Sequence, residues 1–232
     1  MKILALETST KVGSVAISED EHLIAEYTLN VISTHSERLL PSIDQILRDS
    51  KLSIREIDGF AISLGPGSFT GLRIGISTVK GLALAAEKGV VGVPTLDVLA
   101  HNLMFTRLLV CPLLDARKGE VYTALYQGDG SGRLEKLTPD LAIKPDDLLK
   151  MVKEPIIFLG DAVEVYRDRL GGDKDNHFFA PVYLHQPRAS VLAKLGLEKF
   201  KQGHMFKEEE IQPIYCRLAE AEIAWKEKEG SK

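Results

Sequence analysis

One glycine-rich segment constrains the fold of this chain more than any other: Gly65-Pro66-Gly67-Ser68-Phe69-Thr70-Gly71-Leu72-Arg73-Ile74-Gly75. The apolar run 60–64 precedes it, and apolar residues continue at helical spacing to about residue 87. A buried strand is therefore expected to lead through a tight turn, where proline fixes φ and glycine permits positive φ, into a helix capped by Ser68. The segment has neither the Gly-Lys-Ser/Thr of a P-loop nor the G-x-G-x-x-G of a dinucleotide fold.

Glycines persist inside this predicted helix, at Gly71, Gly75 and Gly81. Each costs roughly 1 kcal/mol relative to alanine, so a close contact is expected to compensate. Gly71 and Gly75 are four residues apart and share one face. Three interpretations stay open for that face: packing on a helix of the same chain, packing on another protein, or a phosphate held by backbone N–H groups.

The first half of the chain reads as a meander followed by alternating helices and strands. We expect strands over residues 3–6, 15–17, 23–29, 57–64 and 90–93, and helices over residues 34–49, 68–87 and 94–103. Thr34 and Glu37 predict a capping box at the start of the first helix. This order predicts an α/β fold with a mixed sheet and helices packed on it.

The second half is less regular, and we expect a domain boundary near residue 105. Strands are expected over residues 108–114, 120–127 and 156–159, and helices over residues 145–152, 163–170 and 188–202. The charged tail 219–232 reads as a frayed helix. The predicted division is 1–105 and 106–232.

Composition narrows the functional classes. The 232 residues carry a net charge of −4, which argues against strong nucleic-acid binding by this chain alone. Cys111 and Cys216 lack metal-type spacing and read as reduced thiols. The opening sequence is unlike a signal peptide, and no apolar run reaches the roughly 20 residues of a membrane span. We expect a cytoplasmic protein with no membrane contact.

Four segments, in order along nearly the whole chain, resemble the TsaB (YeaZ) family. They are residues 1–10 (MKILALETST), the glycine-rich segment 65–75, residues 115–122 (DARKGEVY) and residues 213–217 (PIYCR). The chain departs from the family at Gly160-Asp161-Ala162, where the family often has Gly-Asp/Asn-Gly. That departure weakens any nucleotide contact there.

The resemblance implies an actin-like (ASKHA, ribonuclease H-like) fold of two related lobes: an N-terminal lobe with the partner-binding helices and a degenerate C-terminal lobe. It also implies a role in making threonylcarbamoyladenosine next to the tRNA anticodon, as the non-catalytic partner of the paralogue TsaD. The family interface is a helical bundle of the first two helices. The implied interface residues here are His35, Leu39, Leu40, Ile43, Leu47, Phe69, Thr70, Gly71, Leu72, Arg73, Gly75, Ile76 and Val79.

The same resemblance and the apolar helices predict further partners. A second copy is expected to cover the helices in isolation, since a large apolar surface is seldom left open on a monomer. A TsaE-like ATPase is expected to act through the complex, and tRNA to be contacted only indirectly. No cofactor is expected.

Catalytic alternatives are weaker. TsaD-like proteins hold a metal through two histidines four residues apart, and Thr95 and Leu99 stand at those positions here, so no metal site and no M22-like glycopeptidase are expected. An actin-like ATPase or phosphotransferase would use Glu7, Thr8, Ser9 and Thr10 for nucleotide, with Asp115 as a second carboxylate. An ordinary turn with capped N–H groups is the preferred interpretation of these residues. His101 reads as a helix-end histidine. We name no catalytic residue.

Overall fold

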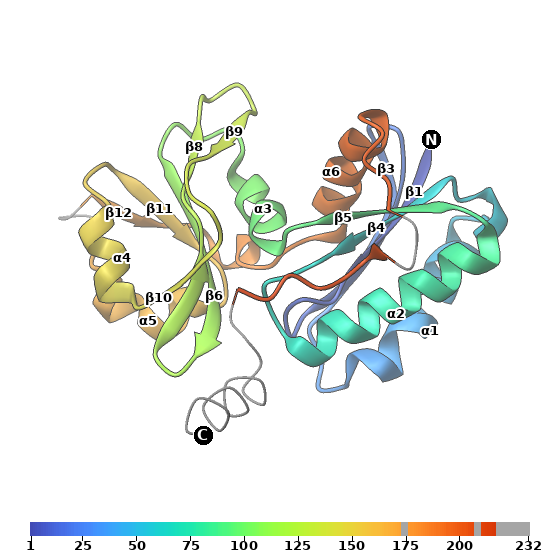
Figure 1. Ribbon diagram of the computed structural model, residues 1–232, viewed down its shortest axis with the longest axis horizontal. Helices are drawn as coiled ribbons and strands as arrows, with labels where there is room; N and C mark the ends of the chain where they lie inside the picture. Colours follow the sequence, from blue (N-terminus) through green and yellow to red (C-terminus); the bar gives the residue numbers. More distant parts are fainter. Residues whose placement is uncertain (173–175, 207–209, 217–232) are drawn as a thin grey trace, which may run out of the picture.

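The computed structural model describes residues 1–172, 176–206 and 210–216 and shows two α/β lobes side by side (Figure 1). The first sheet has the order β3-β2-β1-β4-β5. Its strands are β1 (Lys2–Glu7), β2 (Gly13–Glu19), β3 (His22–Leu29), β4 (Gly59–Ser63) and β5 (Gly89–Val93). The three-strand meander is antiparallel, and β4 and β5 run parallel to β1, as the sequence predicts.

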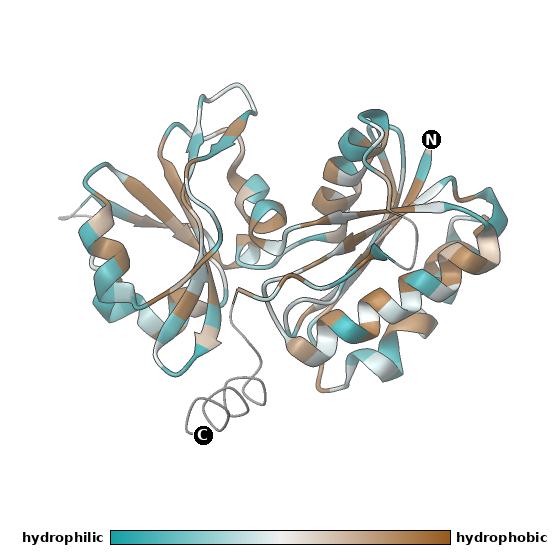
Figure 2. Cartoon of the chain, viewed as in Figure 1, coloured by the Kyte–Doolittle hydropathy of each residue, from teal (hydrophilic) through white to brown (hydrophobic). Residues whose placement is uncertain are grey.

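Strand β1 is buried on both faces, and its alternating side chains enter two separate cores. Leu4 and Leu6 face α1 (His35–Asp49) and α2 (Phe69–Ala86). Ile3 and Ala5 face α6 (Ala189–Lys201). The sheet is therefore covered by α1 and α2 on one side and by α6 on the other, with hydrophobic residues along the central strands and along α2 (Figure 2).

The second lobe repeats this topology. Its sheet has the order β10-β7-β6-β11-β12, with β8 paired to β6 and to β9. The strands are β6 (Leu109–Arg117), β7 (Glu120–Thr123), β8 (Tyr126–Gly128), β9 (Leu134–Lys136), β10 (Leu141–Ile143), β11 (Ile156–Leu159) and β12 (His177–Phe179). As in the first lobe, three strands of the path are antiparallel and the last two are parallel to the central one. The two lobes are related, which confirms the expected actin-like arrangement.

The second lobe corrects one strand of the prediction and adds others. The strand expected over residues 120–127 is divided into β7 and β8, and β9, β10 and β12 were not anticipated. All three are only three residues long, too short for an alternating pattern to stand out. The expected helices are present as α4 (Pro145–Met151) and α5 (Ala162–Leu170), which pack together on one face of the sheet. The predicted tail helix lies outside the described residues.

Each lobe sends its last helix to the other sheet. Helix α3 (Thr95–Ala100) follows β5, yet Leu96 and Leu99 pack in the core of the second sheet. Helix α6 follows β12, yet Leu192 and Ala193 pack on the first sheet. The predicted division at residue 105 therefore does not follow the packing, because α6 belongs structurally with the first lobe. Sequence patterns show that a helix has an apolar face but not which sheet covers it.

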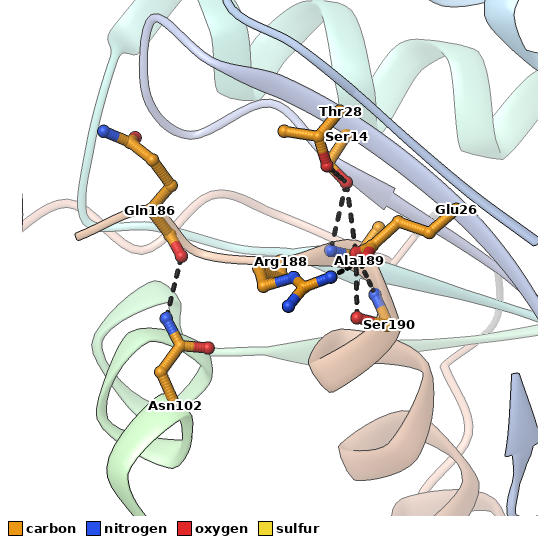
Figure 3. Close-up of polar contacts among 8 residues, drawn as sticks. All are labelled: Ser14, Glu26, Thr28, Asn102, Gln186, Arg188, Ala189 and Ser190. Atoms are coloured by element: carbon orange, nitrogen blue, oxygen red, sulfur yellow. Dashed lines mark hydrogen bonds and ion pairs between the residues drawn. The ribbon is translucent and has the colours of Figure 1, made fainter. Parts of the chain in front are cut away.

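Polar contacts fix the start of α6 against the first sheet (Figure 3). The buried carboxylate of Glu26 on β3 accepts hydrogen bonds from the Ser190 backbone N–H at 2.9 Å and hydroxyl at 2.8 Å, and it pairs with Arg188 at 2.5 Å. A carboxylate beside the N-terminal N–H groups of a helix is favourable. Asn102 donates to the backbone carbonyls of Leu184 at 2.9 Å and Gln186 at 2.8 Å. It thereby joins the two segments that cross between the lobes.

In the described part of the chain, 3-10 turns lie at Ile54–Glu56, His101–Leu103 and Val182–Leu184. Within the described residues, no helix is both long enough and apolar enough to cross a membrane.

Candidate functional site

The glycine-rich turn is held between two distant parts of the chain. Gly65 has φ +106°, and a Cβ built on it would lie 2.7 Å from the carbonyl oxygen of Ile214. The Ile214 N–H donates to the carbonyl of Leu64 at 2.7 Å. On the other side, the Ser68 N–H donates to the carbonyl of Ser9 at 2.6 Å. As predicted, the Ser68 hydroxyl caps α2, accepting from the Gly71 N–H at 3.2 Å.

Gly71 and Gly75 of α2 face the loop that follows β1, whereas Gly81 meets no atom of the described residues within 4 Å. A Cβ on Gly71 would lie 2.1 Å from the carbonyl oxygen of Thr8, and a Cβ on Gly75 would lie 2.2 Å from the Thr8 hydroxyl. That hydroxyl donates to the Gly71 carbonyl at 2.8 Å. The close contact that compensates the glycines is therefore with Thr8 of the same chain. The expectation that these glycines let a partner helix approach is wrong, because Thr8 already occupies the space.

The loop Glu7–Thr10 is turned into the protein. Glu7, Thr8 and Ser9 are at most 1 % exposed, and Thr10 is 6 % exposed. The Glu7 carboxylate accepts from the Ser9 backbone N–H at 2.7 Å, from the Ser9 hydroxyl at 2.5 Å and from the Ser63 hydroxyl. Burial raises the pKa of Glu7, and the bonds from Ser63 and Ser9 oppose that rise. In this arrangement the four residues proposed for nucleotide bind their own chain rather than facing a ligand.

His35 and Arg38 fasten α1 to this loop. His35 Nε2 lies 2.7 Å from the Thr10 carbonyl oxygen, and His35 Nδ1 lies 3.3 Å from an Arg38 guanidinium nitrogen. Since a carbonyl accepts and a guanidinium donates, the neutral Nε2–H tautomer satisfies both contacts. Burial lowers the pKa of His35, the bond to Thr10 opposes this, and the Arg38 charge lowers it further. Arg38 also donates to the carbonyls of Lys11 and Leu29.

Helices α1 and α2 lie side by side on the outer face of the first lobe (Figure 1). Between them is an open groove of about 360 Å³ lined by His35, Ser36, Leu39, Leu40, Arg73, Ile74, Ser77 and Thr78. Leu40 is 56 % exposed at its rim, and Phe69 is 43 % exposed at the start of α2. Such apolar side chains beside hydroxyls and one cation are typical of a protein-binding surface.

The predicted interface residues divide into two sets. Leu40, Phe69, Thr70 and Arg73 are exposed, and His35 and Leu47 are partly exposed, so a partner can reach them. The others are buried in the first lobe: Leu39, Ile43, Gly71, Leu72, Gly75, Ile76 and Val79. Most of these buried residues hold α1 and α2 on their own sheet, and of the seven only Leu39 also lines the groove. Helical spacing alone does not tell which apolar positions of a helix face inward.

The positions aligned with metal-binding histidines are interior. Thr95 and Leu99 are both 0 % exposed, and leucine has no donor atom. Among the described residues, no group of three or more His, Cys, Asp or Glu side chains is placed to hold a metal ion. His101 ends α3, with its Nδ1 2.7 Å from the Asp97 carbonyl oxygen, as expected for a helix-end histidine. Asp115 accepts from the Arg117 backbone N–H at 2.9 Å, a turn contact.

Tyr215 was missed as a site residue, although it lies in a segment that carries the family resemblance. Its ring lies 5.5 Å from that of Phe69, centroid to centroid, at the start of α2. Since 146 positions separate these two residues in the sequence, no local pattern could join them.

The fold and the site together define an actin-like α/β protein of two related lobes, whose first loop is closed by its own glycine-rich helix. The same fold is seen, at 12 % identity and a TM-score of 0.50, in an activator of 2-hydroxyisocaproyl-CoA dehydratase from Clostridium difficile, covering 93 % of this chain and 100 % of that one.

Sequence comparisons then give the family. A family model described as "TsaD: tRNA N6-adenosine threonylcarbamoyltransferase" matches residues 22–225. The tRNA threonylcarbamoyladenosine biosynthesis protein TsaB of Bacillus subtilis (strain 168) is 36 % identical, covering 97 % of this chain and 98 % of that protein. YeaZ from Pseudomonas aeruginosa is 28 % identical with a TM-score of 0.78, covering 92 % of this chain and 99 % of that one. The chain belongs to the TsaB family of tRNA threonylcarbamoyladenosine biosynthesis proteins.

Proposed function

We propose that this chain is the non-catalytic partner of a TsaD-like protein, and that the exposed part of the α1–α2 face docks that partner. The assembly transfers the threonylcarbamoyl group to the tRNA adenosine beside the anticodon. The observation that carries the docking proposal is the groove between the two helices, with Leu40 and Phe69 exposed beside it.

Two further features support a role without chemistry of its own. The polar groups of the loop Glu7–Thr10 form hydrogen bonds within the chain. An actin-like ATPase would need such groups to bind phosphate. Leu99 stands buried where a TsaD-like protein would need a metal ligand. Both features favour binding over catalysis.

Other partners follow from the same docking face. In isolation a second copy of this chain covers the docking face and forms a homodimer. The TsaD-like protein takes the place of that second copy in the working complex. A TsaE-like ATPase joins through the complex, and tRNA reaches this chain only indirectly, in keeping with its net charge of −4. Because the substrate is tRNA, we place the protein in the cytoplasm.

Reconstituted transfer tests the functional proposal. With threonylcarbamoyl-adenylate and tRNA supplied, we expect modification when both proteins are present and none from this chain alone. Transfer or ATP hydrolysis by this chain alone would overturn the proposal.

Leu40→Glu tests the docking face. Burial of a leucine contributes about 1.5–3 kcal/mol and an unpaired interfacial charge is unfavourable, so the Kd for the TsaD-like partner should rise about 10-fold or more. The control is Val165→Glu on α5, which also replaces an exposed aliphatic side chain by a carboxylate, at a residue that is 64 % exposed in the second lobe. Equal affinities for the two variants, measured by isothermal titration calorimetry, would exclude this face.

A further inference from the structure

A preorganised cation lies at the edge of the docking groove. The guanidinium carbon of Arg73 lies 3.8 Å from the centroid of the Phe69 ring, which is cation–π geometry. Arg73 Nε also donates to the Tyr215 hydroxyl at 3.4 Å, and the Tyr215 ring packs on Phe69. These two contacts place the guanidinium over the Phe69 ring, beside the groove.

Tyr215, which contacts both Arg73 and Phe69, lies in the segment 211–215. Ile211 is 2 % exposed in the core of the first lobe, and Ile214 is bonded to Leu64 beside the glycine-rich turn. The segment is thereby anchored on both sides of Pro213, and Tyr215 follows directly. The turn at Gly65 thus also serves to admit the backbone that places Tyr215, since a side chain there would collide with Ile214.

Arg73 lacks a carboxylate partner within the part of the chain that the structure describes. Its contacts there are the Phe69 ring and the Tyr215 hydroxyl, which leave its terminal guanidinium nitrogens without a negative charge. The described residues that line the groove are serine, threonine, histidine and apolar residues beside Arg73, and none of them is acidic. A planar guanidinium presents paired donors that match a carboxylate, so an exposed arginine that is stacked on a ring and has no acid partner among the described residues is suited to bind a carboxylate from outside.

We propose that Arg73, stacked on Phe69 and steadied by Tyr215, is the charged anchor of the docking face and binds a carboxylate of the TsaD-like partner. This inference rests on the proposed function. The partner segment that fits is an apolar helix face for the groove, with one aspartate or glutamate at its edge. Arg73 touches the partner, and Tyr215 acts as a positioning residue.

Binding of the full-length chain to the TsaD-like protein at several salt concentrations tests this. Arg73→Gln should raise the Kd about 10-fold or more, as truncation of an arginine anchor does. It should also make the Kd less dependent on salt concentration. Arg73→Lys keeps the charge but not the planar guanidinium, so its Kd should lie between those of the wild type and Arg73→Gln. Tyr215→Phe keeps the ring and should weaken binding severalfold. Arg55→Glu, an exposed change outside the groove lining, should leave the Kd within about twofold, a typical rim effect.

The outcomes separate the two proposals. If the wild-type chain does not bind the TsaD-like protein, the proposed function itself fails. If the wild type binds and Arg73→Gln binds equally well with the same salt dependence, only the anchor is refuted. If ATP or inorganic phosphate binds the isolated wild type but not Arg73→Gln, the ligand is a phosphate rather than a partner carboxylate, and the proposal is overturned. Unchanged thermal midpoints of the variants show that folding is intact.

Discussion

Two glycines of α2 give opposite expectations for the same substitution. Gly75→Ala adds a Cβ 2.2 Å from the Thr8 hydroxyl and 3.1 Å from Ile62, whereas the Cβ of Gly81→Ala meets no atom of the described residues within 4 Å. Both changes gain about 1 kcal/mol of helix propensity. At Gly75, overpacking costs about 1–3 kcal/mol, and turning the Thr8 hydroxyl away from the Gly71 carbonyl costs a further 1–3 kcal/mol or so.

The expected net effect of Gly75→Ala is therefore a destabilisation of about 1–5 kcal/mol. For a chain of this size, about 2–4 °C of midpoint corresponds to each kcal/mol. Thermal unfolding followed by circular dichroism should show a lower midpoint for Gly75→Ala and a slightly higher one for Gly81→Ala.

A double-mutant cycle tests whether the destabilisation by Gly75→Ala arises from the contact with the Thr8 hydroxyl. In a Thr8→Ala background the hydroxyl is gone, so adding Gly75→Ala should cost much less than it does in the wild type. If Gly75→Ala raises the midpoint as Gly81→Ala does, then Thr8 does not pack against α2 as described and the account of the closed loop is refuted.

Two further predictions concern the anchoring of α1 and the crossing segments. Because the folded protein lowers the pKa of His35, the unfolded chain binds more protons below the ordinary pKa of 6.5, and stability is lost as the pH falls below that value. As the pH is lowered from 7.5 to 5, the thermal midpoint should therefore fall more steeply for the wild type than for His35→Gln. Parallel curves would contradict the burial of the His35 imidazole between α1 and the loop. Asn102→Ala removes two hydrogen bonds to segment 181–188 and should cost about 1–3 kcal/mol. Hydrogen exchange should then speed up in that segment, and unchanged exchange would show that the link is not needed.

The closed loop supports the proposed role without nucleotide chemistry. In this chain the carboxylate of Glu7 and the hydroxyl of Thr8 are bound by Ser9, Ser63 and Gly71. The same interactions that remove these groups from solvent fix the start of α2, where Phe69 and Arg73 emerge. We infer that the polar loop holds the first turn of α2, and with it the docking face, in position.

Much of the first lobe could be predicted from the sequence because its signals are local. The continuous apolar run over residues 3–6 predicted the buried strand β1, and the turn at 65–67 predicted the change from strand to helix. The capping box of α1 is present, with the Glu37 carboxylate accepting from the Thr34 N–H at 2.8 Å. Each of these depends on residues two to four positions apart, so a short window contains the whole interaction. The family resemblance added the fold class and the functional context.

Tertiary structure alone decided the contacts on which the candidate site depends. Gly75 faces Thr8 across 67 positions, and Tyr215 meets Phe69 across 146. Helix α6 returns to the first sheet, where Glu26 of β3 receives its N-terminus. The sequence marks these residues as glycine, aromatic or acidic, but which of them meet depends on how the two lobes exchange their last helices. Burial and pairing are properties of the assembled core, and no local periodicity encodes them.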